Sequence, residues 1–200
     1  MIFSEEKIRF YKEQDNKMYG VMSYFLSKTI TEIPIQIILS NLVFLVTYWA
    51  TGLDTSSNDK YFYYILTLFL AGYSGSTFAV FAASLFDNKD LIPAIFPLII
   101  YTQVQAAGYF VSSKNIPYVF YLFKYISLYR YTYQSLSWNE FSNLTPEGLD
   151  CKIPQLCRLP TDDFPEGMLW SLMALVILSV CNNLLAATAL KIRVYMRKVK

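Results

Sequence analysis

Histidine is absent from the 200-residue sequence, and cysteine is scarce, with only three residues. Without histidine, His-based catalytic arrangements and most metal sites are excluded. Charged residues make up only 16% of the chain, whereas soluble proteins average about 25%. The net charge of +2 gives no strong basic field, so we predict no nucleic-acid partner.

Hydrophobic residues are abundant, at 54% of the sequence, and 18% of the residues are aromatic. A helix that crosses a membrane needs about 20 mostly apolar residues, because each residue rises about 1.5 Å through a hydrocarbon core about 30 Å thick. Four segments meet this length, at residues 19–53, 61–86, 91–113 and 167–190. We therefore predict an all-α, multi-pass integral membrane protein with four transmembrane helices.

A fifth apolar stretch, at residues 116–129, is shorter and is interrupted by Lys124. Its length favours a re-entrant or interfacial helix over a fifth crossing, which is the alternative. We place this helix at the start of an external segment at residues 114–166.

The orientation is predicted from the basic residues that flank the spans. The tail at residues 191–200 carries five Lys or Arg residues and no acid, so we expect it in the cytoplasm. Four crossings then place residues 1–18 in the cytoplasm as well. Apolar and charged residues alternate there, which predicts a short amphipathic helix that lies on the membrane surface or on a partner.

The external segment contains two features that are typical of the non-cytosolic side of a membrane. Asn143-Leu144-Thr145 is a candidate glycosylation site. Cys151 and Cys157 are separated by five residues, and we predict a disulfide between them, with an intersubunit bridge as the alternative.

Several amides lie within the apolar segments, where an amide without a partner is unfavourable. For each of them the sequence leaves open hydrogen bonding between helices or contact with a substrate cavity. The residues are Asn41, Gln103, Gln105, Asn182 and Asn183.

Two stretches resemble a known family. The run from Phe3 to Glu13, followed by Lys28 and Glu32-Ile33-Pro34, resembles the coupling helix and following span of G-subfamily ABC transporters, with Glu6-Lys7 where the family usually has Glu-Arg. The stretch Tyr125-Ile126-Ser127-Leu128-Tyr129-Arg130-Tyr131, followed by Asn139-Glu140-Phe141, resembles the Tyr-x-Ser-x-x-Arg-Tyr and Asn-Glu-Phe signature of the same family. That family often has proline where this chain has Leu128.

The resemblance implies that the four spans are the third to sixth spans of a six-span ABC-2 type transmembrane domain. It also implies an N-terminal nucleotide-binding domain in the same polypeptide, which binds ATP and Mg, and a homodimer or heterodimer with a second half transporter. The present sequence contains no Gly-x-x-x-x-Gly-Lys-[Ser/Thr] phosphate-binding loop, so we predict no ATP hydrolysis and no cofactor in this segment itself.

Site residues follow from the same resemblance. The expected contacts with the nucleotide-binding domain are Glu5, Glu6, Arg9, Phe10 and Glu13. The expected substrate cavity and its apolar plug are Ile100, Tyr101, Val104, Gly108, Tyr109 and Phe110. The expected structural signature is Arg130, Tyr131, Asn139 and Glu140.

The function expected from this resemblance is ATP-driven export of lipid-like or amphipathic substrates, across the plasma membrane or an organelle membrane and in contact with membrane lipids. The alternative is a non-transporting membrane scaffold or assembly subunit. That alternative uses the same helix packing without an ATPase partner.

Overall fold

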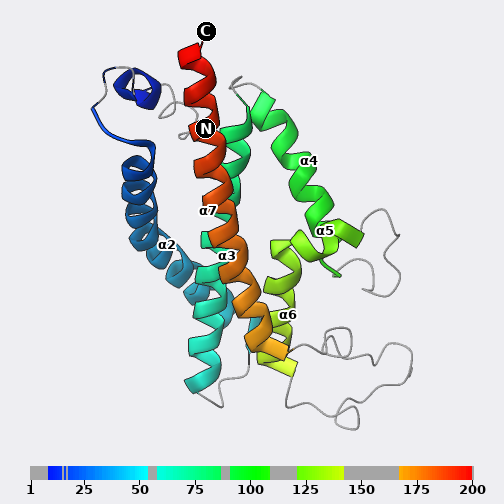
Figure 1. The fold of residues 1–200 in the computed structure, drawn as a ribbon. Coiled ribbons are helices and arrows are strands. Elements are labelled where there is room, and N and C mark those ends of the chain that lie inside the picture. Colours follow the sequence, from blue (N-terminus) through cyan, green and yellow to red (C-terminus); the bar gives the residue numbers. More distant parts are fainter. Residues whose placement is uncertain are drawn as a thin grey trace.

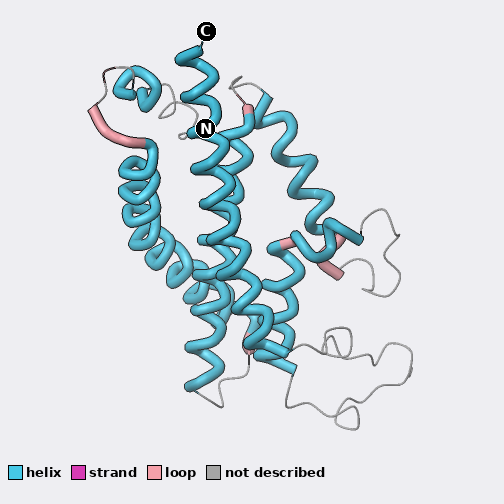
Figure 2. The backbone as a smooth tube through the Cα atoms, in the orientation of Figure 1, coloured by secondary structure: helices cyan, strands magenta, loops and turns pink. Residues whose placement is uncertain are grey.

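The computed structural model describes residues 9–14, 16, 18–53, 58–86, 91–108, 121–141 and 167–199. A short helix at residues 9–14, which we call the arm, precedes six further helices (Figure 1). They are α2 (Val21–Thr51), α3 (Asn58–Leu85), α4 (Leu91–Gln105), α5 (Tyr121–Ile126), α6 (Leu128–Phe141) and α7 (Gly167–Val199). These described parts contain helices, turns and loops but no strand (Figure 2), which confirms the predicted all-α fold.

Three helices, α2, α3 and α7, are long and apolar enough to cross a membrane. This finding confirms the prediction of a multi-pass membrane protein. The third predicted span, 91–113, corresponds to α4, which has 15 residues and is therefore about 22 Å long. Residues 109–113 of that predicted span lie outside the described residues.

The helices run alternately between the two ends of an elongated bundle (Figure 1). From the end that carries the arm, which we call the arm end, α2 leads to the far end and α3 returns. The chain then leaves the arm end along α4, turns through α5 at mid-height and reaches the far end along α6. The last helix, α7, returns to the arm end, so its last turns and the arm lie at the same end of the bundle.

The centre of the bundle is α3, which packs against α2, α6 and α7. Close packing against α2 depends on Gly72, because a Cβ atom at that position would lie 1.6 Å from Nε2 of Gln36. Most of the apolar side chains of α2, including Leu26 and Ile38, are exposed on the outside of the bundle. Lipid tails suit such a surface, which would be unusual for a soluble protein.

The arm end of α3 is joined to α7 by a charged side chain. Arg193 donates a hydrogen bond to the backbone oxygen of Leu85, at the last residue of α3. The final carbonyl groups of a helix have no partner within the helix, and a basic side chain satisfies them well. This contact fixes the end of α3 beside the last turns of α7.

Candidate functional site

The arm is fixed to the bundle by Phe10, whose side chain is only 1% exposed. The ring belongs to a buried cluster formed with one residue of α2, two of α3 and three of α7. These residues are Phe25, Val80, Ala83, Ala186, Ala187 and Leu190. Three of the six are alanines, so the helices leave room for the ring where they converge. The sequence predicted Phe10 as a coupling residue, and the structure places it in contact with α2, α3 and α7.

A group of aromatic rings surrounds Phe10. The centroids of the Phe10 and Tyr24 rings are 4.5 Å apart, and those of Phe10 and Tyr19 are 6.0 Å apart. Tyr19 and Tyr24 stack nearly parallel. Such pairs add about 0.5–1.5 kcal/mol beyond the burial of their area. The aromatic group therefore fixes the orientation of the arm relative to the first turn of α2.

A hydrogen bond also holds the arm. The hydroxyl group of Tyr19 donates to a carboxylate oxygen of Glu13, one of the predicted coupling residues, in the last turn of the arm. Burial, together with this hydrogen bond and the negative charge of Glu13, raises the pKa of Tyr19 to about 12. The phenol therefore keeps its proton at physiological pH, and the arm stays tied to the turn that leads into α2.

Between the arm and α2 lies a hollow of about 270 Å³. Its lining combines aromatic rings, hydroxyl groups and charges of both signs. The lining residues are Arg9, Phe10, Glu13, Tyr24, Ser27, Lys28 and Thr31. The structure thus brings three of the five predicted coupling residues together. The other two, Glu5 and Glu6, lie outside the described residues.

The predicted cavity residues lie along α4 and the turn that follows it. Tyr101 is 61% exposed, whereas Ile100 and Val104 are half-buried. Gly108 ends this part of the chain with a φ of 91°, in a left-handed conformation that glycine adopts without strain. The two plug residues, Tyr109 and Phe110, lie outside the described residues.

The signature motif forms the junction between α4, α5 and α6. Ser127 separates α5 from α6 and accepts a hydrogen bond from the backbone N–H of Arg130, so it caps α6. Its hydroxyl group donates to the backbone oxygen of Gln103, 2.8 Å away, and so ties α6 to α4. The sequence predicted one short helix in this region, but this serine divides the segment into two. Leu128 occupies the first helical position, where proline is common, so the break here does not depend on proline.

Arg130 is almost completely buried. Its guanidinium carbon lies 5.3 Å from the ring centroid of Tyr125 and 5.7 Å from that of Tyr131. The hydroxyl group of Tyr131 donates to the backbone oxygen of Tyr125. Aromatic faces attract the planar guanidinium group and compensate in part for its burial. Arg130 and Tyr131 therefore contact Tyr125 across the junction and join α6 to α5.

Polar side chains also join α6 to α3. The hydroxyl groups of Thr67 and Ser135 lie 2.8 Å apart. The side-chain amide of Asn139 donates to the backbone oxygen of Lys60, at the start of α3. Glu140, the remaining signature residue, is half-buried near the end of α6. Although α6 is the most polar of the long helices, its polar face is enclosed by other helices.

The amides left open by the sequence fall into different environments. Asn183 donates to the hydroxyl group of Tyr73 and joins α7 to α3, as expected for hydrogen bonding between helices. Asn41 is exposed and donates to a backbone oxygen of its own helix. Gln103 is buried beside α6, whereas Gln105 and Asn182 are half-buried.

The remaining predicted sites lie in the external segment. Asn143 and the predicted disulfide pair, Cys151 and Cys157, are outside the described residues. Within the described parts of the chain, no group of three or more acidic or cysteine residues is arranged to hold a metal ion.

Residues 1–141 match the model of a known family, described as "ABC-2 type transporter". The chain belongs to this family. It is 34% identical to ABC transporter G family member 2 of Arabidopsis thaliana over 144 residues, which cover 72% of this chain and 19% of that protein. It is 30% identical to G family member 1 of the same plant over 187 residues, covering 94% of this chain and 24% of the relative. These similarities confirm the resemblance to G-subfamily transmembrane domains.

A relative from Caenorhabditis elegans, ABC transporter ATP-binding protein/permease wht-1, is 30% identical over 134 residues. They cover 66% of this chain and 20% of the relative. The chain thus spans about a fifth to a quarter of the length of these relatives. As an ABC-2 membrane domain, it is a transmembrane component of a transporter and is not itself catalytic.

The contacts of three residues, Ser127, Tyr19 and Ser76, were not predicted from the sequence, although Ser127 belongs to the quoted signature. The sequence does contain a signal for Ser127, because a serine directly before a helix is a typical N-cap. Tyr19 donates a hydrogen bond to Glu13, and Ser76 on α3 donates one to Glu32 on α2. No local pattern indicates either contact, since each depends on how separate segments pack.

Proposed function

We propose that this chain is the membrane-embedded part of an ATP-driven exporter of lipid-like or amphipathic molecules. The observation that carries the proposal is the burial of Phe10 in a cluster with residues of α2, α3 and α7. Packed interiors transmit displacement because they tolerate few voids. A push on the arm therefore reaches three crossing helices at once, as a coupling element requires.

The source of that push is a nucleotide-binding domain in the same polypeptide, N-terminal to the arm. It binds ATP and Mg and closes against a second such domain in a dimer of half transporters. The name of the wht-1 relative combines an ATP-binding protein with a permease, which supports this arrangement. Arg9 and Glu13 lie at opposite ends of the arm helix and carry charges of opposite sign, and both line the hollow between the arm and α2.

The substrate pathway runs along α4. This helix makes limited contact with α3, α5 and α6, and Tyr101 and Leu98 are largely exposed. Aromatic and aliphatic side chains suit an apolar or amphipathic cargo. In the dimer, the α4 helices of the two copies face a shared cavity, and Tyr109 and Phe110 close it on the external side.

The test uses the full-length protein in proteoliposomes, with ATP-dependent movement of a fluorescent phospholipid as the measurement. Glu13→Lys is expected to leave assembly and ATP hydrolysis intact and to reduce transport at least fivefold. Tyr19→Phe serves as the matched control, because it removes the hydrogen bond to Glu13 without reversing a charge. The control is expected to retain most of the transport.

Replacement of Tyr109 and Phe110 by alanine tests the plug, with increased ATP hydrolysis in the absence of substrate as the expected result. If the wild-type protein hydrolyses no ATP and moves no amphipathic probe, the exporter assignment is wrong. A non-transporting membrane scaffold is then the better description.

A further inference from the structure

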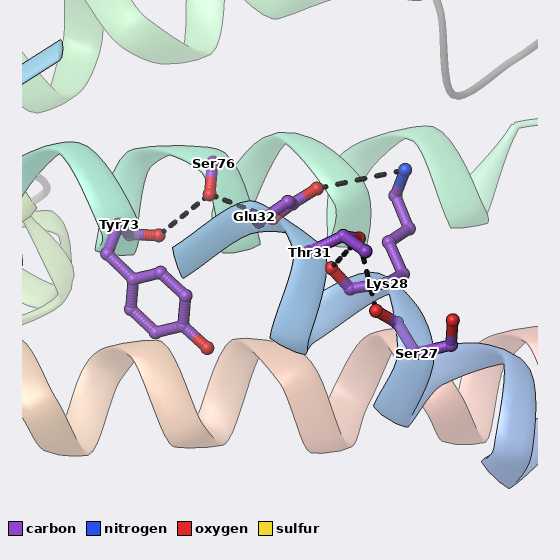
Figure 3. Close-up of polar contacts among 6 residues, drawn as sticks. All are labelled: Ser27, Lys28, Thr31, Glu32, Tyr73 and Ser76. Atoms are coloured by element: carbon purple, nitrogen blue, oxygen red, sulfur yellow. Dashed lines mark hydrogen bonds and ion pairs between the residues drawn. The ribbon is translucent and has the colours of Figure 1, made fainter. Parts of the chain in front are cut away.

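Lys28 and Glu32 are the only charged residues of α2, which has 31 residues. They lie one helical turn apart, and the distance from Nζ of Lys28 to Oε1 of Glu32 is 3.7 Å (Figure 3). Both side chains are mostly shielded, at 17% and 25% exposed. Acidic side chains are rare within membrane-crossing helices because an unpaired carboxylate is unfavourable there. Packing alone does not require a carboxylate at this position, so Glu32 needs a further explanation.

Glu32 also contacts the next helix. The hydroxyl group of Ser76, on α3, donates to Oε2 of Glu32 at 3.1 Å (Figure 3). Each carboxylate oxygen therefore has a different partner: Oε1 faces Lys28 on its own helix, and Oε2 faces α3. Lys28 also lines the hollow that is lined by Arg9 and Glu13, so the polar contacts that reach α3 begin beside the arm.

The hydroxyl group of Ser76 has two acceptors within reach. It also lies 3.1 Å from the backbone oxygen of Tyr73, in its own helix (Figure 3). A hydroxyl group has one proton, so Ser76 donates to Glu32 or to Tyr73 and remains satisfied in either state. The contact between α2 and α3 can therefore open without leaving the partly buried hydroxyl donor of Ser76 unpaired, which would be unfavourable. Such a side chain is a two-state element of the kind that a conformational change requires.

We propose that Glu32 is a positioning residue that transmits movement of the arm to α3. In the arrangement seen here, Glu32 joins Lys28 to Ser76. When the arm moves, the charges around Lys28 in the hollow change, Glu32 stays paired with Lys28 but separates from α3, and the hydroxyl group of Ser76 donates its hydrogen bond to the backbone oxygen of Tyr73 instead. The two helices are then free to slide past one another. This inference rests on the proposed function, because it assigns one step of the coupling between ATP hydrolysis and transport.

The test compares two serines of α3 in the full-length protein in proteoliposomes. Ser76→Ala removes the contact with Glu32, whereas Ser74→Ala removes a hydroxyl group that donates to the backbone oxygen of Ala71 in its own helix. The measurement is the amount of fluorescent phospholipid moved per ATP hydrolysed. We expect at least a threefold decrease for Ser76→Ala, no change for Ser74→Ala, and wild-type coupling for Ser76→Thr, which keeps the hydroxyl group.

A second comparison shows whether the groups act together. Glu32→Gln keeps an oxygen that accepts from Ser76 but removes the charge that faces Lys28, so it is expected to lower coupling as well. If the two residues act as a unit, the double variant Glu32→Gln, Ser76→Ala is expected to be less impaired than the product of the single effects predicts. This comparison remains informative if Ser76→Ala does not assemble.

The outcomes separate the two proposals. A wild-type protein without ATP-dependent transport overturns the proposed function. If the wild-type protein does transport, then unchanged coupling in both Ser76→Ala and Glu32→Gln overturns the role of Glu32. An equal loss in Ser74→Ala also overturns it, because the effect would then belong to α3 packing in general.

Discussion

Replacement of Phe10 by alanine is expected to release the arm from the bundle. The ring is almost fully buried in the cluster at the arm end. Replacing a buried phenylalanine by alanine costs about 3–5 kcal/mol, which includes the cavity that is left. Only the docking of the arm depends on this ring, so the lower end of the range is appropriate. A loss of about 3 kcal/mol is equivalent to roughly a hundredfold increase in the open population, at 1.4 kcal/mol for each factor of ten.

Amide hydrogen exchange measures this population, because local opening governs the exchange of the arm amides. In Phe10→Ala, the backbone amides of residues 9–14 are expected to exchange roughly a hundredfold faster than in the wild-type protein. For an amide that is less strongly protected in the wild-type protein, the increase is limited to the protection that it has there. The amides in the middle of α3 are expected to be unchanged. This measurement needs neither ATP nor a substrate, so it tests the docking of the arm independently of the transport proposal.

Two further variants make the experiment specific. Phe10→Leu keeps much of the apolar volume and is expected to increase exchange far less than alanine does. Tyr195→Ala removes an aromatic ring that is 70% exposed on α7 at the same end of the bundle, and it is expected to have no effect on the arm. The docking model is refuted if Phe10→Ala stays within about threefold of the wild-type protein, or if Tyr195→Ala has an equal effect.

Three other predictions follow from single contacts. Ser127→Ala removes the cap of α6 and its bond to the end of α4, so it is expected to destabilise the protein by about 1–2 kcal/mol; a thermal melt in detergent that equals the wild-type melt would contradict this role. Thr67→Val removes the bond to Ser135 at a cost of about 0.6 kcal/mol, typical of bonds between membrane helices. A double-mutant cycle with Ser135→Ala measures that cost, and additive effects would exclude the bond. The pKa of Tyr19 is raised from 10.0 to about 12 in the docked arm. The protonated Tyr19 side chain therefore contributes fully to docking of the arm below pH 10, and this contribution is lost as the pH rises towards 12. The mobility of a spin label at Asn16→Cys is expected to increase over that range, and Tyr19→Phe is expected to abolish the step.

The sequence predicted the crossing helices because each is a long apolar run, and length together with apolar composition decides whether a helix can span a membrane. The α2 helix is an example. Its last residue is Thr51, and the next residue, Gly52, caps it in a left-handed conformation with a φ of 63°. The predicted span ended nearby, at residue 53. For the polar segment from Arg130 to Asn139, the sequence did not predict the surroundings of the helix. Its signature indicated a structural role, yet a helix of low hydrophobicity beside a loop that was predicted to be external gave no sign that it would be enclosed by α3 and α7.

For the arm, the sequence likewise predicted the helix but not its contacts. Its alternation of charged and apolar residues predicted an amphipathic helix, and Phe10 was among the expected coupling residues. The sequence did not indicate what the ring would contact, because Ala83 and Ala186 have ordinary positions in their own helices and form a recess only where α3 and α7 converge.

Composition and the lengths of the apolar runs therefore determined that this protein is an all-helical membrane protein, since burial in lipid depends on each segment by itself. Only the tertiary structure decided which side chains meet, such as Ser76 with Glu32 or Tyr19 with Glu13. Those contacts depend on the crossing and rotation of whole helices. Packing sets both, and no single stretch of sequence specifies them.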